Sequence, residues 1–128
     1  MVTPSGTRLL IVDDELALLG LLKRYLERLG YQVDLAATAE DALAGFTEDP
    51  KRYSCVLTDL TLPGMNGEQL AERLRELNPK LPVIISSGYP YEPKSPRTRF
   101  LQKPYLPQML VETVEKVLGK SSLGKPDK

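Results

Sequence analysis

The strongest constraint on the fold is an alternation of short apolar runs with amphipathic segments along the chain. The short runs predict strands at residues 8–12, 31–36, 54–58, 82–86 and 99–102. The segments between and after them have apolar residues at helical spacing, which predicts helices at 15–29, 38–49, 68–77 and 107–118. Strands that alternate with helices, joined by right-handed crossovers, predict an α/β fold: a doubly wound parallel sheet covered on both faces.

A chain of 128 residues with 41% apolar residues is enough for one domain with an ordinary core. We expect that domain to span residues 8–118. Residues 1–7 are then an N-terminal tail. Residues 119–128 are polar and are expected to form a C-terminal tail or linker.

Charge and apolar content exclude several functional classes. The 17 basic and 17 acidic residues cancel. The basic cluster of Lys94, Arg97 and Arg99 has no aromatic or helix-turn-helix context, so we expect no nucleic-acid binding by this domain alone. No apolar stretch approaches the roughly 18 residues of a membrane helix, and the start does not resemble a signal peptide, which favours a cytoplasmic location. The single cysteine, Cys55, lies in an apolar run and is interpreted as a small buried hydrophobe.

Polar residues gather where the predicted strands end. In an open parallel sheet, the functional site lies beyond the carboxyl ends of the strands. We therefore expect the polar side chains at four of these ends to meet at one edge: Asp13 and Asp14 after the first strand, Asp59 after the third, Ser86 and Ser87 at the fourth, and Lys103 after the fifth.

These residue types suit phosphoryl transfer. Three carboxylates in one crevice repel one another unless a hard cation such as Mg²⁺ joins them. A carboxylate with an open face beside the metal can act as a nucleophile toward phosphorus. The charge on the phosphoryl oxygens could be neutralised by Mg²⁺, by the Lys103 ammonium group and by the Ser87 hydroxyl. The set contains no base that would hydrolyse the product quickly.

Each of these residues also has an ordinary structural explanation. Asp13 or Asp14 could cap the first helix, and Asp59 could be a turn residue. Ser87 before a glycine is often a turn hydroxyl, and Lys103 before a proline is often a surface lysine. The signal lies in their joint spacing, with each residue at the end of a successive apolar strand.

Four segments of the chain resemble the receiver (response-regulator) domain family. They are Leu10 to Glu15 (LIVDDE), Leu57 to Gly67 (LTDLTLPGMNG), Leu81 to Gly88 (LPVIISSG) and Phe100 to Tyr105 (FLQKPY). The resemblance covers about residues 8–118 and implies a CheY-like, flavodoxin-like fold, with a five-stranded parallel sheet in the order 2-1-3-4-5. The last segment and the triplet at residues 87–89 are most similar to receivers attached to hybrid histidine kinases.

The resemblance assigns roles at the acidic end of the sheet. Asp59 matches the phosphoacceptor. Asp14 and Asp59 would hold Mg²⁺ by their side chains, Thr61 by its backbone carbonyl, and Asp13 mostly through water.

Further roles fall on residues around the acceptor. Ser87 matches the switch hydroxyl, Lys103 the family's lysine and Phe100 its aromatic switch position. The bond before Pro104 is expected to be cis. Thr61 and Tyr89 match two variable positions that tune the lifetime of the phosphoryl group.

The chain departs from the family pattern before its last strand. The family places a full helix there, but this segment has only residues 90–99, three of them proline: Pro90, Pro93 and Pro96. Proline costs about 3 kcal/mol in a helix interior and disfavours helix at the residue before it. We expect the fourth helix to be missing or reduced to a turn. Either the output face differs, or the loop is a tolerated deletion.

The sequence thus predicts a phosphorylation-controlled switch rather than an enzyme. The expected partners are a sensor histidine kinase, in trans or in the same polypeptide, and an output domain or protein; homodimerisation remains open. One alternative is a non-phosphorylated adapter, for which the proline-rich loop is the best support. A second is a metal-dependent phosphohydrolase, but such enzymes need an acid two residues after the nucleophile, where this chain has Thr61.

Overall fold

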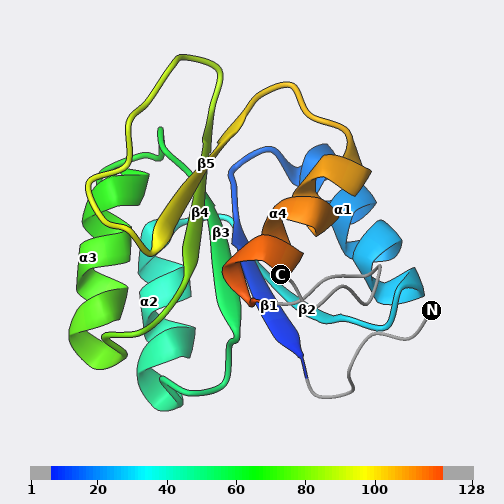
Figure 1. Ribbon diagram of the computed structural model, residues 1–128. Coiled ribbons are helices and arrows are strands. Elements are labelled where there is room, and N and C mark those ends of the chain that lie inside the picture. The colour runs from blue at the N-terminus through cyan, green and yellow to red at the C-terminus, as the bar shows by residue number, and fades with distance from the viewer. Residues whose placement is uncertain (1–6, 120–128) are drawn as a thin grey trace.

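The computed structural model describes residues 7–119, which form nine helices and strands (Figure 1). In chain order these are β1 (Arg8–Val12), α1 (Leu16–Arg28), β2 (Gln32–Ala36), α2 (Ala39–Glu48), β3 (Cys55–Asp59), α3 (Gly67–Leu77), β4 (Val83–Ser87), β5 (Thr98–Gln102) and α4 (Pro107–Val117). Every predicted strand and helix is present, with ends that differ by at most one residue.

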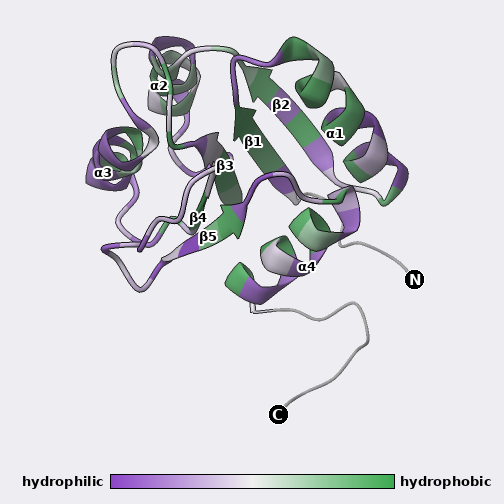
Figure 2. Cartoon of the chain, turned by 90° about the horizontal axis from the view of Figure 1, so that it is seen from above, coloured by the Kyte–Doolittle hydropathy of each residue, from purple (hydrophilic) through white to green (hydrophobic). Residues whose placement is uncertain are grey.

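The strands form one parallel sheet in the order β2-β1-β3-β4-β5. Helices α1 and α4 cover one face, and α2 and α3 cover the other (Figures 1 and 2). The doubly wound, flavodoxin-like architecture and the strand order expected from the resemblance are therefore confirmed.

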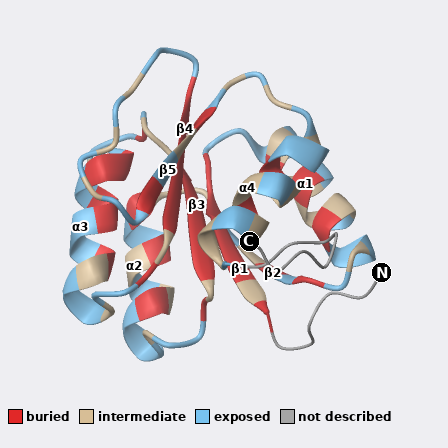
Figure 3. Cartoon of the chain, viewed as in Figure 1, coloured by how far each residue is buried: buried red, intermediate tan, exposed pale blue. Residues whose placement is uncertain are grey.

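Each face of the sheet has its own apolar core, because successive residues of a strand point to opposite faces. In β4, Val83 and Ile85 join the cluster beneath α2 and α3, while Ile84 joins the cluster beneath α1 and α4. All five residues of β4 are buried, as the central strands in Figure 3 show. A strand buried on both faces reads as a continuous apolar run, which is why the sequence located it well.

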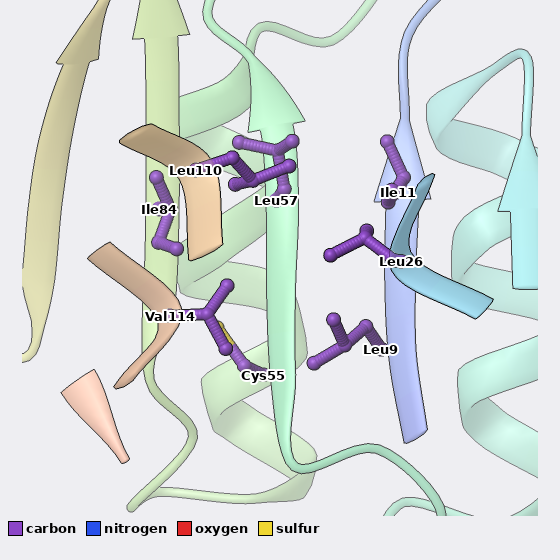
Figure 4. Close-up of a pocket in the computed structure, with 8 residues that line it drawn as sticks. All are labelled: Leu9, Ile11, Leu26, Cys55, Leu57, Ile84, Leu110 and Val114. Atoms are coloured by element: carbon purple, nitrogen blue, oxygen red, sulfur yellow. The ribbon is translucent and has the colours of Figure 1, made fainter. Parts of the chain in front are cut away.

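A small cavity lies in the core beneath α1 and α4 (Figure 4). It leaves about 10 Å³ for the centre of a water molecule, and its walls are entirely apolar: Leu9, Ile11, Leu26, Cys55, Leu57, Ile84, Leu110 and Val114. Such a space has no polar partner for water. Burial raises the pKa of the Cys55 thiol to about 12, so Cys55 packs as the apolar residue that the sequence suggested.

Local signals set the helix ends. Thr38 caps α2 by accepting a hydrogen bond from the Asp41 N–H at 3.0 Å. Asn66 and Gln69 form a reciprocal capping box at the start of α3. Gly67 is the first residue of α3, so this helix begins one residue before the predicted range of 68–77.

No helix connects β4 to β5. Residues 88–97 form an irregular loop, which confirms that the family's fourth helix is missing. Tyr91 from this loop packs on the core beneath α2 and α3, and its ring lies 6.1 Å from that of Phe100. One aromatic side chain therefore covers part of the sheet that a helix would otherwise cover.

Candidate functional site

Three carboxylates meet at the carboxyl ends of β1 and β3. Asp13 and Asp14 follow β1 directly, and Asp59 is the last residue of β3. One oxygen from each lies within 4.8 Å of the others. Asp13 is buried, Asp59 is partly buried and Asp14 is exposed, so the cluster opens to solvent on the Asp14 side. The structure thus brings together the three acids singled out from the sequence.

Lys103 reaches this cluster from the loop after β5. Its Nζ lies 3.0 Å from Asp13 Oδ2 and 3.3 Å from Asp59 Oδ2. The peptide bond between Lys103 and Pro104 is cis, as expected from the resemblance. The ammonium group bridges two of the three carboxylates and leaves Asp14 unpaired within the described residues.

The electrostatics of the site reflect crowded carboxylates. Burial raises the pKa of Asp59, and the charge of Asp13 raises it further, although Lys103 opposes both. Burial alone would lower the pKa of Lys103, but its hydrogen bond and charge interaction with Asp13, together with Asp59, raise it overall. The raised pKa of Lys103 means that its protonated form is stabilised. The raised pKa of Asp59 means that its ionised form is destabilised relative to an exposed aspartate.

The neighbouring residues are placed as follows. Thr61 is exposed, and its N–H lies 3.4 Å from Asp59 Oδ1. Ser87 is buried at the end of β4, where its hydroxyl accepts a hydrogen bond from the Tyr89 N–H at 3.0 Å. The Ser87 carbonyl accepts from the Lys103 N–H at 2.8 Å. Ser87 and Lys103 are thus tied together through the backbone beside the carboxylates.

Gly67 is a structural part of the site for which the sequence indicated no role. Its N–H donates to the Leu60 carbonyl at 2.8 Å. A Cβ atom on Gly67 would collide with the backbone carbonyl of Asp59. The start of α3 therefore packs directly on the backbone of Asp59. A glycine at the end of a loop gives no sequence signal of such a close approach.

Most of the chain matches one known protein family. A family model for the response regulator receiver domain matches residues 9–115. The chain belongs to the response regulator receiver family. Receivers are regulatory, phosphorylatable domains of two-component systems, and they work with histidine kinases and output domains.

Individual receivers show the same relationship. The transcriptional regulatory protein SrrA of Staphylococcus aureus is 34% identical over 122 residues, which cover 91% of this chain and 49% of SrrA. The receiver domain of the hybrid histidine kinase CckA superposes with a TM-score of 0.79 at 32% identity, covering 87% of this chain and 98% of that one. The response regulator TrrA of Thermotoga maritima, solved in complex with Mg²⁺-BeF, gives 0.74 at 28% identity, covering 87% and 98%.

The chain spans only 22% to 49% of the length of the first curated relatives it matches. Among residues 7–119, no helix has the length and apolar character needed to cross a membrane. The predicted tail at 1–7 and the tail or linker at 119–128 lie almost wholly outside the described residues, so those boundaries stay predictions.

Proposed function

We propose that Asp59 accepts a phosphoryl group from the phosphohistidine of a sensor histidine kinase, in trans or in the same polypeptide. The reaction depends on Mg²⁺, and the resulting switch controls an output domain or a protein partner. The observation that carries this proposal is the placement of the Asp59 carboxylate at the end of β3, among two further carboxylates and 3.3 Å from the Lys103 ammonium.

The residues present fit a magnesium ion. Three carboxylate oxygens within 4.8 Å of one another are hard ligands that a divalent cation can share. Asp14 and Asp59 would hold the ion by their side chains, Thr61 by its carbonyl, and Asp13 through water. When bound, Mg²⁺ would neutralise charge on the phosphoryl oxygens. The similarity to TrrA, solved with Mg²⁺-BeF, supports this assignment.

The chain's own residues account for the transfer. An Asp59 oxygen forms a bond to phosphorus as the bond from phosphorus to the donor imidazole nitrogen breaks, and the electron pair stays on the imidazole. Lys103, already beside Asp59, stabilises the new charge on the phosphoryl oxygens. Ser87 also contributes to the site. Its hydroxyl oxygen releases the hydrogen bond that it accepts from the Tyr89 N–H, and the hydroxyl then donates a hydrogen bond to a phosphoryl oxygen. This rearrangement connects the phosphoryl group to the loop at 88–97.

The alternatives have weaker support. In the phosphohydrolase reading, an acid would be needed at the position of the exposed Thr61. The adapter alternative does not require the cluster of Asp13, Asp14 and Asp59, although Lys103 would still neutralise two of these carboxylates. Homodimerisation, a cytoplasmic location and the absence of nucleic-acid binding remain predictions.

Intact-mass spectrometry after incubation with acetyl phosphate tests the proposal. We expect the native chain to gain one phosphoryl group only when Mg²⁺ is present. Asp59→Asn should gain none. A matched control, Asp41→Asn, removes an exposed acid from α2 and should be phosphorylated like the native chain. If the native chain stays unmodified and also fails to bind fluoroberyllate, the adapter function replaces this proposal.

A further inference from the structure

Buried polar atoms without partners gather on one side of the sheet. Among the described residues, four such side-chain atoms have no hydrogen-bond partner: Glu68 Oε1, Arg75 Nη2, Tyr91 Oη and Thr98 Oγ1. They belong to α3, to the loop at 88–97 and to β5, the elements that border the place of the missing helix. Buried polar groups are nearly always paired in folded proteins. Their concentration here marks a place where a partner group is missing.

An open groove runs between α3 and the loop at 88–97, which lie side by side in Figures 1 and 2. Glu68, Glu72 and Lys94 line both ends of it. Tyr91 and Thr61 line the end nearer to Asp59, and Arg75 and Glu76 line the other. We call this feature the α3–loop groove.

The α3–loop groove has an excess of negative charge. Glu68, Glu72 and Glu76 face only two cations, Arg75 and Lys94. Within residues 7–119, none of these five side chains forms an ion pair, although Arg75 interacts electrostatically with Glu68 and with Arg97. Glu68 is only 8% exposed, and one of its oxygens has no hydrogen-bond donor. A buried carboxylate oxygen without a donor is costly, so a further cationic donor would be favoured here.

We propose that the α3–loop groove binds an arginine-bearing segment of a partner protein, with the guanidinium group between Glu68 and Glu72. These two residues are four apart on α3 and so lie on the same side of the helix. A guanidinium group has several donors in a fixed plane and loses less hydration than an ammonium group, which suits a partly buried pair of carboxylates. The Tyr91 hydroxyl oxygen is a further acceptor nearby.

Glu68 Oε1 is buried in this structure, so a guanidinium group would reach it only after the residues around it rearrange. The loop has no helical hydrogen bonds to break, so its displacement costs less than the unwinding of a helix. The inference goes beyond the proposed phosphorylation and does not depend on it. Thr61 at one end of the groove lies two residues after Asp59, so a bound segment would contact the surroundings of the phosphoacceptor.

Fluorescence anisotropy with a labelled peptide tests the inference. The probe is a short blocked alanine peptide with two arginines one helical turn apart, and its counterpart carries two glutamates instead. We expect the native chain to bind the arginine peptide and not the glutamate peptide. Glu72→Gln removes an exposed carboxylate and should weaken binding about tenfold, the equivalent of one charge-assisted hydrogen bond. Lys94→Gln removes a competing cation and should tighten binding.

Matched controls separate the groove from general charge attraction. Glu112→Gln and Lys116→Gln make the same charge changes on α4, which covers the opposite face of the sheet, and should leave binding unchanged. Asp14→Asn should also leave it unchanged. The inference is overturned if the native chain binds neither peptide, if Glu112→Gln weakens binding as much as Glu72→Gln, or if Asp14→Asn abolishes binding while Glu72→Gln does not.

Discussion

The ring of Tyr91 lies against the ring of Phe100, with centroids 6.1 Å apart and planes tilted by 59°. Tyr91 belongs to the loop after β4, and Phe100 to β5. From the resemblance to receivers, Phe100 is expected to be the aromatic switch position, and Ser87, the last residue before this loop, the switch hydroxyl. The contact therefore links the two expected switch residues through a loop rather than through a helix.

Replacement of Tyr91 should show what its ring contributes. Tyr91→Ala removes a partly buried ring from the core beneath α2 and α3 and should lower the free energy of unfolding by about 2 kcal/mol. Tyr91→Phe keeps the ring and removes a hydroxyl that has no partner, so stability should hold or rise. Urea denaturation measures both. An equal loss in the two variants would show that the hydroxyl, not the ring, anchors the loop.

Substitution of Gly67 should displace the backbone of Asp59. The added Cβ of Gly67→Ala would meet the Asp59 carbonyl, so we expect a loss of about 1–3 kcal/mol, typical of overpacking, and slower phosphorylation of Asp59. Gly45→Ala is the matched control, because Gly45 lies in α2 with open space around its Cβ position and should gain about 0.5–1 kcal/mol. Chemical denaturation and phosphorylation kinetics test both. A neutral Gly67→Ala would contradict the close approach.

Neutralisation of Asp59 should stabilise the protein in the absence of metal. Burial raises the pKa of Asp59, and Asp13 adds to this, so the folded state disfavours its charge near neutral pH. Asp59→Asn should therefore raise the melting temperature by a few degrees, and added Mg²⁺ should stabilise this variant less than the native chain. Thermal denaturation with and without Mg²⁺ measures both. A lower melting temperature would mean that the ion pair with Lys103 outweighs the repulsion.

The titration of Tyr53 should make the free energy of unfolding depend on pH in the alkaline range. Burial, together with a 2.6 Å hydrogen bond to Asp34 and the charge of that residue, raises the pKa of Tyr53 from 10.0 to about 12. The folded state thus holds the phenolic proton more tightly than the unfolded state. The stabilisation is complete below pH 10 and is lost as the pH rises from 10 to 12.

Tyr53→Phe tests this dependence by urea denaturation at several pH values. The variant should lose less stability than the native chain between pH 10 and pH 12, although it starts lower because Asp34 loses a donor. Tyr89→Phe removes an exposed phenol and should follow the native curve. Parallel curves for Tyr53→Phe and the native chain would contradict the assigned pKa.

Sequence reasoning predicted the architecture because the central strands β1, β3 and β4 are buried on both faces. The apolar run Val83 to Ile85 indicated an interior strand, and Thr38 and Gly30 lie at the ends of their helices. The prolines at 90, 93 and 96 predicted the missing helix for the same local reason. The convergence of Asp13, Asp14 and Asp59 followed from strand direction alone.

What sequence reasoning missed depends on packing between distant segments. The contact of Gly67 with the Asp59 backbone arises from the angle at which α3 meets the sheet. The sequence did not indicate that Lys103 pairs with Asp13 as well as with Asp59, because such a contact depends on side-chain geometry. The expected contact of Lys103 with a phosphoryl group stays a prediction.

The helix-free connection between β4 and β5 also makes the chain suitable for reporter design. In a connection built on a helix, an insertion must respect helical phase; in the irregular loop at 88–97, doubling the length costs only about 0.6 kcal/mol in closure entropy. Pro90 and Glu92 are exposed on either side of Tyr91, so a fluorescent module inserted after Glu92 would leave the ring contact with Phe100 intact. If phosphorylation of Asp59 moves the loop as proposed, the emission of this module would report the phosphorylation state in real time.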